Sequence, residues 1–308
     1  MTPIPLESNS LKKIYRNRGR ATTAINNFTF SVKDKGVFSL LGRNGSGKTT
    51  FVKVSTTQLT PDDGYVKVFG KDVVNDEKEL RHMISLVPQE SRPFPHMTPY
   101  EHVYLFQKMN GKTREESKDR AESVIGLLGM EDFAKVECVN LSGGQKQLTM
   151  VAMALSLDAQ IYFLDEPTIG LDIITRKRVW NAINKYRNAG KSIFLTTHYL
   201  DEAAILSDEI GIVSHGNFIK QGTLDELRSG LEYDTRVAIR GRTDAKDFEQ
   251  YGRVYSHERS TVIFTNQENV EKILSDSSVR KERIEIGPVG LDDVFISLVG
   301  EDIEVDEN

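Results

Sequence analysis

A glycine-rich run near the start of the chain has the residue types and spacing that bind phosphate groups. Residues 42–49 read GRNGSGKT and fit the pattern G-x-x-x-x-G-K-[ST]. Glycines let backbone N–H groups curl around phosphate oxygens, and a helix that starts at such a loop adds partial positive charge. Lys48 can reach the β- and γ-phosphates of a nucleotide, and the Thr49 hydroxyl can bind Mg²⁺. The run therefore predicts a nucleotide-phosphate site.

Two adjacent carboxylates follow the short apolar run at residues 161–164. Asp165 stands at the tip of the strand that this run predicts, where it can hold Mg²⁺ directly or through water. Glu166 comes next, where a base could polarise an attacking water. Such pairs are common on protein surfaces. The apolar strand before this pair, in a chain with a phosphate loop, makes it a candidate for phosphoryl chemistry.

A second candidate anion site lies far along the chain, at Leu141–Gln145, which reads LSGGQ. Two glycines beside Ser142 suit a helix start better than a helix interior, and apolar residues recur at helical spacing after them. One nucleotide rarely needs two phosphate cradles from one chain. A head-to-tail dimer resolves this, because each nucleotide would lie between the lysine loop of one chain and the serine loop of the other. A capped helix without a ligand is the plainer interpretation.

Short apolar strands alternating with helices must position these residues, which predicts a largely parallel sheet wrapped by helices. The expected strands are Gly36–Leu41, Met83–Pro88, Ile161–Asp165 and Ser192–Thr196, and Lys48–Gln58 is the helix that the phosphate loop opens. Residues 98–157 are mostly helical, and Thr113 and Glu116 form a capping box for a helix that ends near Leu128.

The last 78 residues differ in composition from the rest. Residues 231–308 carry 10 basic and 18 acidic side chains, a net charge of −8, against +3 for the remainder. An acidic domain argues against a nucleic-acid surface, because phosphate binding needs clustered Lys and Arg. The expected order is strand, helix, strand, strand, helix, strand, with the first helix at Asp244–Tyr251, as in a small ferredoxin-like unit. Apolar residues at helical spacing follow from Leu291 to Leu298, and they could close this domain's core or pack across a dimer axis.

Several classes of protein are disfavoured by the composition. The chain has 308 residues, of which 28% are charged and 38% hydrophobic, an ordinary globular mixture. No stretch approaches the ~18–20 consecutive apolar residues that cross a bilayer, and no secretory signal is visible, so we expect a cytosolic protein. The single cysteine, Cys138, cannot form an internal disulfide or a zinc cluster.

In combination these motifs resemble the ATP-binding subunit of ABC transporters, over about residues 6–230. The resemblance implies an α/β P-loop NTPase cassette at residues 1–230, with a mixed sheet core and a helical subdomain at about residues 90–157. A small α+β accessory domain, regulatory or supporting a dimer, would follow at residues 231–308. Two positions depart from the family pattern, since Ile173 replaces a common proline and Met153 a frequent arginine.

The resemblance carries roles over to residues of this chain. It implies that Lys48, Gln89, Glu166 and His198 are catalytic, with Glu166 as the base and His198 as the switch that contacts the γ-phosphate. Thr49, Gln89 and Asp165 would bind Mg²⁺. ATP would be contacted from four places. Tyr15 would stack on adenine, and Asp172 would contact ATP from the dimer-crossing loop. The other contacts would come from the phosphate loop, with Gly42, Arg43, Asn44, Gly45, Ser46, Gly47, Lys48, Thr49 and Thr50, and from the signature, with Ser142, Gly143, Gly144 and Gln145.

The partners implied are a separate transmembrane permease and a second cassette, in a homodimer or a mixed pair, with no nucleic acid. The protein would lie on the cytoplasmic face of the membrane through its permease. The segment from Val289 to Leu298 is similar to the closing segment of cassettes that serve drug, antibiotic and lipid exporters, which favours export. The alternative is a soluble ABC ATPase that acts with an assembly scaffold, on DNA or in translation. Cassettes of those kinds differ by a long coiled coil, a tandem repeat or the absence of a tail.

Overall fold

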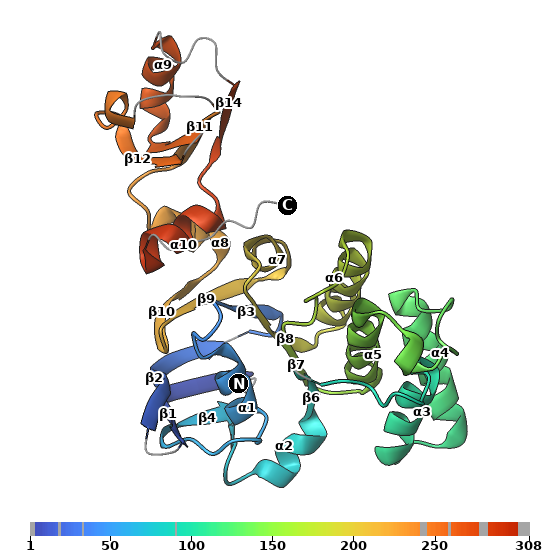
Figure 1. Ribbon diagram of the computed structural model, residues 1–308. Helices are drawn as coiled ribbons and strands as arrows, with labels where there is room; N and C mark the ends of the chain where they lie inside the picture. Colours follow the sequence, from blue (N-terminus) through green and yellow to red (C-terminus); the bar gives the residue numbers. More distant parts are fainter. Residues whose placement is uncertain are drawn as a thin grey trace. The chain divides into compact units, whose positions relative to one another are not determined.

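The chain divides into two compact units, residues 1–221 and 222–308 (Figure 1). The computed structural model describes residues 4–17, 20–32, 34–89, 91–240, 245–257, 260–276 and 283–300. The sequence predicts the division at residue 230. The units divide earlier because helix α8 (Leu224–Ser229) packs against α10 (Leu291–Val299) and so forms part of the second unit.

A six-stranded sheet, in the order β10-β9-β3-β8-β7-β6, forms the centre of the first unit. The strands β6, β7, β8, β3 and β9 are parallel. Their bounds are β3 (Val37–Leu41), β6 (Ile84–Val87), β7 (Ile161–Asp165), β8 (Ser192–Thr197), β9 (Glu209–Ser214) and β10 (Asn217–Gly222). The four strands that the sequence predicts are confirmed, with ends shifted by no more than one residue.

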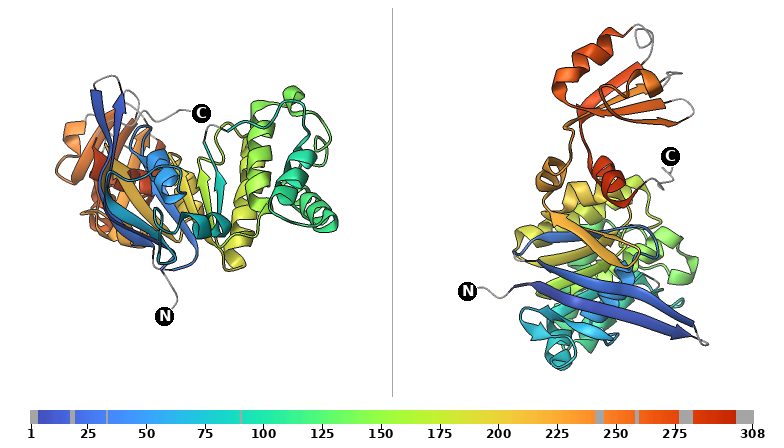
Figure 2. Two further views of the ribbon diagram at one scale, coloured as in Figure 1. Left: turned by 90° about the horizontal axis from the view of Figure 1, so that it is seen from below. Right: turned by 90° about the vertical axis from the view of Figure 1, so that its left-hand side faces the viewer.

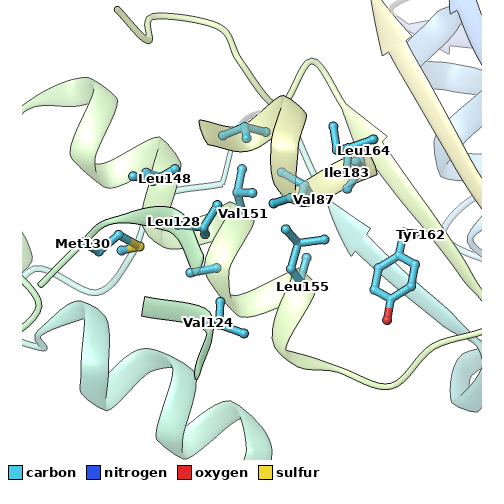
Figure 3. Packing of buried hydrophobic residues seen from close by; sticks show 14 of the residues in the cluster. Val87, Val124, Leu128, Met130, Leu148, Val151, Leu155, Tyr162, Leu164 and Ile183 are labelled. Carbon is cyan, nitrogen blue, oxygen red and sulfur yellow. The ribbon is translucent and has the colours of Figure 1, made fainter. Parts of the chain in front are cut away.

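Both faces of this sheet are buried, so its strands read as continuous apolar runs. Along β7 the side chains alternate between two cores: Tyr162 and Leu164 belong to one, and Ile161 and Phe163 to the other. Figure 3 shows Tyr162, Leu164 and Val87 with residues of the surrounding helices in the first of these cores. The parallel sheet therefore holds the ends of its strands, where the candidate residues lie, between two packed layers.

Four helices form a layer on the first face of the sheet. They are α3 (Pro99–Met109), α4 (Arg114–Leu128), α5 (Gly143–Ser156) and α6 (Ile173–Asn188), with the short turn η1 (Cys138–Asn140) between α4 and α5. Helices α5 and α6 contact the strands, and α3 and α4 pack against these two helices. Thr113 and Glu116 form the predicted capping box, and α4 ends at Leu128 as expected. Among the described residues, no helix combines the length and the apolar composition that crossing a bilayer requires.

An antiparallel sheet, in the order β2-β1-β4-β5, covers the other face, where the sequence analysis expects helices. Its strands are β1 (Leu6–Asn17), β2 (Arg20–Val32), β4 (Asp63–Val68) and β5 (Lys71–Asp72). Helix α1 (Lys48–Ser55) packs into the same core, and α2 (Glu77–Met83) leads into β6. Figure 2, left, shows the strands of this sheet and helices α3–α5 on opposite sides of the first unit. The mixed sheet core is thus two sheets that share one apolar layer.

The second unit contains a four-stranded antiparallel sheet in the order β12-β13-β11-β14. Its elements are β11 (Thr235–Arg240), η2 (Ala245–Asp247), β12 (Gly252–His257), β13 (Ser260–Thr265), α9 (Gln267–Ser275) and β14 (Arg283–Pro288). This is the strand order of a ferredoxin-like unit, with a core formed by residues such as Val237, Ile263 and Ile273. Asp244, the first residue of the first predicted helix, lies outside the described residues, and over the rest of it the prediction is wrong: a 3₁₀ turn over residues 245–247 and further turns to residue 251 replace it.

Candidate functional site

The phosphate loop joins β3 to α1, and its path leaves no room for side chains at two glycines. Gly47 has φ +105°, and a Cβ there would lie 2.6 Å from the carbonyl oxygen of Ala24. A Cβ on Gly42 would lie 2.5 Å from the carbonyl oxygen of Val213. Helix α1 begins at Lys48, so its first-turn N–H groups are available at the loop. The predicted strand–loop–helix is therefore present, and glycine is required by geometry.

Backbone groups from distant parts of the chain brace this loop from behind. The N–H of Gly216, in the turn between β9 and β10, donates to the carbonyl of Ser46 over 3.2 Å. The carbonyl of Gly216 accepts from the N–H of Asn26 on β2 over 2.6 Å. The hydroxyl of Ser46 is buried and has no hydrogen-bond partner among the described residues, as expected of a group whose partner is a ligand.

Lys48 is buried, with its ammonium turned back over the loop. Its Nζ donates to the carbonyls of Gly42 over 2.6 Å and Arg43 over 3.2 Å, and lies 3.5 Å from Oε1 of Glu166. Burial lowers the pKa of Lys48, while the carboxylates of Glu166 and Asp165 oppose this shift. The loop therefore holds a positive charge in a poorly solvated place, where it attracts an anion strongly.

Three side-chain oxygens converge at the start of α1. The Thr49 hydroxyl donates to Oε1 of Gln89 over 2.8 Å and lies 3.4 Å from Oδ1 of Asp165. Hydroxyl, amide and carboxylate oxygens are ligands that Mg²⁺ prefers. A cavity of about 220 Å³ adjoins the cluster and is lined in part by these same three residues. The donor set therefore fits a magnesium ion held beside the phosphate loop.

Asp165 ends β7 and is almost fully buried. Its Oδ1 accepts a hydrogen bond of 2.5 Å from the Thr196 hydroxyl on the neighbouring strand β8. Burial raises the pKa of Asp165 although this hydroxyl and that of Thr49 oppose the shift. Thr196 is a residue of the site that the sequence did not predict. The feature that could have indicated this role is the position of Thr196 at the end of a parallel strand, because the pairing of β7 with β8 places Thr196 opposite Asp165.

Glu166 and His198 face each other next to Lys48. Glu166 has φ +50°, a strained conformation for a residue other than glycine. Its Oε2 lies 3.2 Å from Nδ1 of His198, although the two atoms are not aligned as a hydrogen bond. Burial alone would raise the pKa of Glu166, but His198 and Lys48 together hold it below its ordinary value. The arrangement can keep a carboxylate base charged in a buried place.

Tyr15 lies on β1 and is 40% exposed, with its hydroxyl 3.4 Å from that of Thr50. An exposed ring beside the helix that follows the phosphate loop is available for stacking. Arg43, Asn44 and Gly45 are exposed at the tip of the loop. The structure thus places the first-unit candidates from β1, the loop, β7 and β8 around one site.

The signature residues form a different surface of the first unit. Ser142 caps α5, since its hydroxyl accepts from the N–H of Gln145 over 3.2 Å while the Gln145 side chain accepts from the N–H of Ser142. Gly143 is exposed, with open space where a side chain would stand. Within the described ranges, no hydrogen bond or ion pair joins Ser142–Gln145 to the phosphate loop. Contacts of the described residues thus do not join the two candidate anion sites within one chain.

Asp172 has a structural task that the sequence analysis did not assign. Its side chain caps α6 by accepting from the N–H groups of Ile174 over 2.9 Å and Thr175 over 3.0 Å. The hydroxyl of Thr175 donates to its second oxygen over 2.7 Å. Hydrogen bonds from these backbone N–H groups and the Thr175 side chain lower the pKa of Asp172. In the sequence, this capping role is indicated by an aspartate that stands directly before a predicted helix.

Comparison with known proteins gives consistent matches. The sequence pattern of the ABC transporter family matches residues 25–169. The daunorubicin/doxorubicin resistance ATP-binding protein of Streptomyces peucetius is 29% identical over 310 residues, 96% of this chain and 92% of that protein. The linearmycin resistance ATP-binding protein of Bacillus subtilis is 31% identical over 234 residues, 76% of this chain and 74% of that protein.

Solved structures show the same similarity in three dimensions. A dimeric ATP-binding cassette in a post-hydrolysis state, bound to ADP and Pi, aligns with a TM-score of 0.65 at 25% identity. The alignment covers 71% of this chain and 98% of that one.

Proposed function

Since this chain belongs to the ABC transporter family, as an ATP-binding subunit related to drug-export systems, we propose that it hydrolyses ATP to power a separate transmembrane permease. The observation that carries the ATPase proposal is one cluster at the ends of neighbouring parallel strands. It joins the Lys48 ammonium, the Thr49–Gln89–Asp165 oxygens and the Glu166–His198 pair. Phosphoryl transfer requires these parts, since catalysis there is mostly positioning and charge stabilisation.

In the proposed reaction, the chain's own residues bind the phosphates and move one proton. Lys48 and the first-turn N–H groups of α1 hold the β- and γ-phosphates. Glu166 accepts the proton of the attacking water, and its lowered pKa keeps it ready as a carboxylate. His198 orients Glu166 and approaches the γ-phosphate. Thr49, Gln89 and Asp165 would hold Mg²⁺, which neutralises charge on the phosphate oxygens when bound.

The separation of the two anion sites supports a paired cassette. Ser142 and Gly143 are exposed at the start of α5, and no hydrogen bond or ion pair of the described residues joins them to the phosphate loop of the same chain. We propose that they close over the nucleotide of a second cassette, whose own signature closes over this one. The helix start supplies N–H groups for the γ-phosphate.

Replacement of Glu166 tests the reaction. Glu166→Gln should keep ATP binding and lose turnover by roughly 100-fold or more, because the amide cannot accept the proton. With Mg-ATP in both interfaces, the variant should elute as a dimer in size-exclusion chromatography. Glu115→Gln, on the exposed side of α4, is the matched control and should behave as wild type. Normal turnover in Glu166→Gln would refute the role of Glu166, and a monomer at micromolar concentration would refute the paired cassette.

The transport role rests on the relatives, both of which are resistance proteins by name. We propose an exporter, with this chain on the cytoplasmic face of the membrane. The native protein should then sediment with membranes and be released by high salt or alkali. Recovery of all the protein in the supernatant at low salt would favour a soluble ATPase that acts on a scaffold, DNA or the ribosome.

A further inference from the structure

A fully buried carboxyl group, Glu202 on α7 (Leu200–Leu206), lies outside the proposed reaction but close to its parts. Its Oε1 accepts two hydrogen bonds of 2.8 Å, one from the Thr168 hydroxyl and one from the indole N–H of Trp180 on α6. The side chain is 0% exposed, and no donor among the described residues is aligned for a hydrogen bond with its Oε2. Such burial of an acid is costly and calls for an explanation.

No ion pair joins Glu202 to a cation among the residues that the structure describes. Arg176 is the nearby cation, but its guanidinium lies 4.3 Å over the Tyr199 ring and 3.9 Å from the carboxylate of Asp201. Burial raises the pKa of Glu202, while the hydrogen bonds that it accepts oppose the shift. The hydroxyls of Thr197 and Thr168 and the indole N–H of Trp180 are the groups that oppose it, so Glu202 acts as an acceptor for neighbouring donors.

One donor connects Glu202 to the segment that carries the proposed base, the other connects it to helix α6, and the chain itself connects it to the segment that carries the proposed switch. Thr168 lies two residues after Glu166, in a turn where the N–H of Ile169 donates to the carbonyl of Glu166 over 3.3 Å. His198 stands just before α7, on the chain segment that leads to Glu202. One carboxyl group thus ties the segment after Glu166 to the segment after His198.

The same turn also contacts the signature helix. The side chain of Gln147 on α5 donates to the carbonyl of Pro167 over 3.3 Å. A Cβ on Gly144 would lie 3.0 Å from the carbonyl of Gly170, so α5 and residues 167–170 are in close contact. The turn anchored by Glu202 therefore lies between the signature and the Glu166–His198 pair of one chain.

We propose that Glu202 is a positioning residue, which fixes the spacing of Glu166 and His198 by holding the turn at residues 167–171 and helix α6 to the start of α7. The inference rests on the proposed ATPase function, because it concerns the geometry of that reaction. Small displacements of a base reduce turnover more than they reduce binding, since the phosphates are held by a different loop.

Two substitutions of similar size separate positioning from simple burial. Glu202→Gln keeps an oxygen that can accept both hydrogen bonds, so kcat should stay within about threefold of wild type. Glu202→Leu removes the acceptor, and kcat should fall roughly 10- to 100-fold while KM for ATP stays within about threefold. Tyr186→Phe removes a different buried hydrogen bond of α6, to the carbonyl of Leu155, and should leave kcat unchanged.

Trp180 supplies a readout of the link itself, because it is the single tryptophan of the chain. Loss of the bond to its indole N–H should shift the emission maximum in Glu202→Leu but not in Glu202→Gln or Tyr186→Phe. Mg-ATP should change the emission of the wild type and fail to do so in Glu202→Leu. If Glu202→Leu does not fold, Thr168→Val removes one donor and must reproduce the loss of kcat.

The outcomes distinguish this inference from the proposed function. A wild-type protein without ATPase activity would overturn the proposed function and this inference with it. An active wild type with equal kcat in Glu202→Leu or in Thr168→Val would overturn the positioning role alone. Equal losses in Glu202→Gln and Glu202→Leu, or an equal loss in Tyr186→Phe, would also overturn it.

Discussion

Among single residues, the buried ammonium of Lys48 has the clearest expected effect. We predict that Lys48→Ala lowers kcat/KM for ATP by roughly 100-fold or more, because it removes the ammonium charge that is aimed at the β- and γ-phosphates. Steady-state phosphate release measures this. Lys78→Ala, on the exposed surface of α2, is the matched control. Equal rates in the two variants would contradict the assignment of residues 42–49 as the phosphate loop.

At this scale, motif residues could be predicted and their supporting contacts could not. Lys48, Asp165 and Glu166 stand next to recognisable apolar strands, so their meeting at one sheet edge follows from the sequence. Thr196 and Glu202 matter through hydrogen bonds across strands and helices, which depend on register and side-chain direction. A single sequence contains no spacing that fixes such partners.

At the scale of the elements, two helices begin with the same capping box, which allows a matched test. Ser142 with Gln145 caps α5, and Thr113 with Glu116 caps α4. Ser142→Ala and Thr113→Ala should each lower the free energy of unfolding by about 1 kcal/mol. Only Ser142→Ala should also reduce ATPase activity and ATP-driven dimerisation. Urea unfolding and steady-state kinetics on both variants measure the difference, and equal kinetic effects would leave the signature serine with a capping role only.

A second test concerns the contact between β1 and the start of β4. Asp62 accepts from the N–H of Ile14 over 2.8 Å and pairs with Lys13 and Arg16. The pKa of Asp62 is lowered from 3.8 to about 2, chiefly by the backbone hydrogen bond from Ile14 and also by these two cations. A lowered pKa stabilises the fold above the unfolded-state value, and the effect is lost as the pH falls through the folded-state value.

Asp62→Asn should therefore lower Tm at pH 7, and its difference from wild type should shrink as the pH falls from about 4 towards 2. Asp63→Asn makes the same charge change at the adjacent residue, which lacks the contacts to Lys13 and Arg16, so it should have little effect on Tm. Calorimetry across this pH range measures both. A Tm difference that stays constant with pH would show that Asp62 does not act through its charge.

The strands of the antiparallel sheet were the largest omission in the sequence analysis, for a physical reason. Strand β2 is mostly exposed, so its polar residues hide the alternation that marks a strand. Register shifts between Ser8 and Ile14 interrupt the pairing of β1 with β2, and Asn27 has φ +63°. A period of two cannot be read through such irregularities. The central strands were predictable because burial on both faces makes them continuously apolar.

For the whole molecule, the acidic second unit should modulate the cassette without contributing to its chemistry. We propose that it supports dimerisation or regulates turnover, since the residues of the candidate site all lie in the first unit. Truncation after Gly222 keeps β10 and should preserve ATP binding, while dimerisation weakens or the ATPase rate changes. Titration calorimetry and analytical ultracentrifugation measure the two effects. A truncated protein with a native circular-dichroism spectrum that binds no ATP would refute this division of labour.

The brace behind the phosphate loop has a consequence for the order of events during synthesis. Residues 42–49 leave the ribosome early, but the backbone of Gly216, which bonds both Ser46 and Asn26, leaves it much later. Contacts between residues so far apart in sequence form only after the chain between them can be ordered. A nascent chain therefore cannot complete the loop until residue 216 has cleared the exit tunnel. From that moment cellular ATP can act as a folding ligand, because it binds the finished unit and not its precursors.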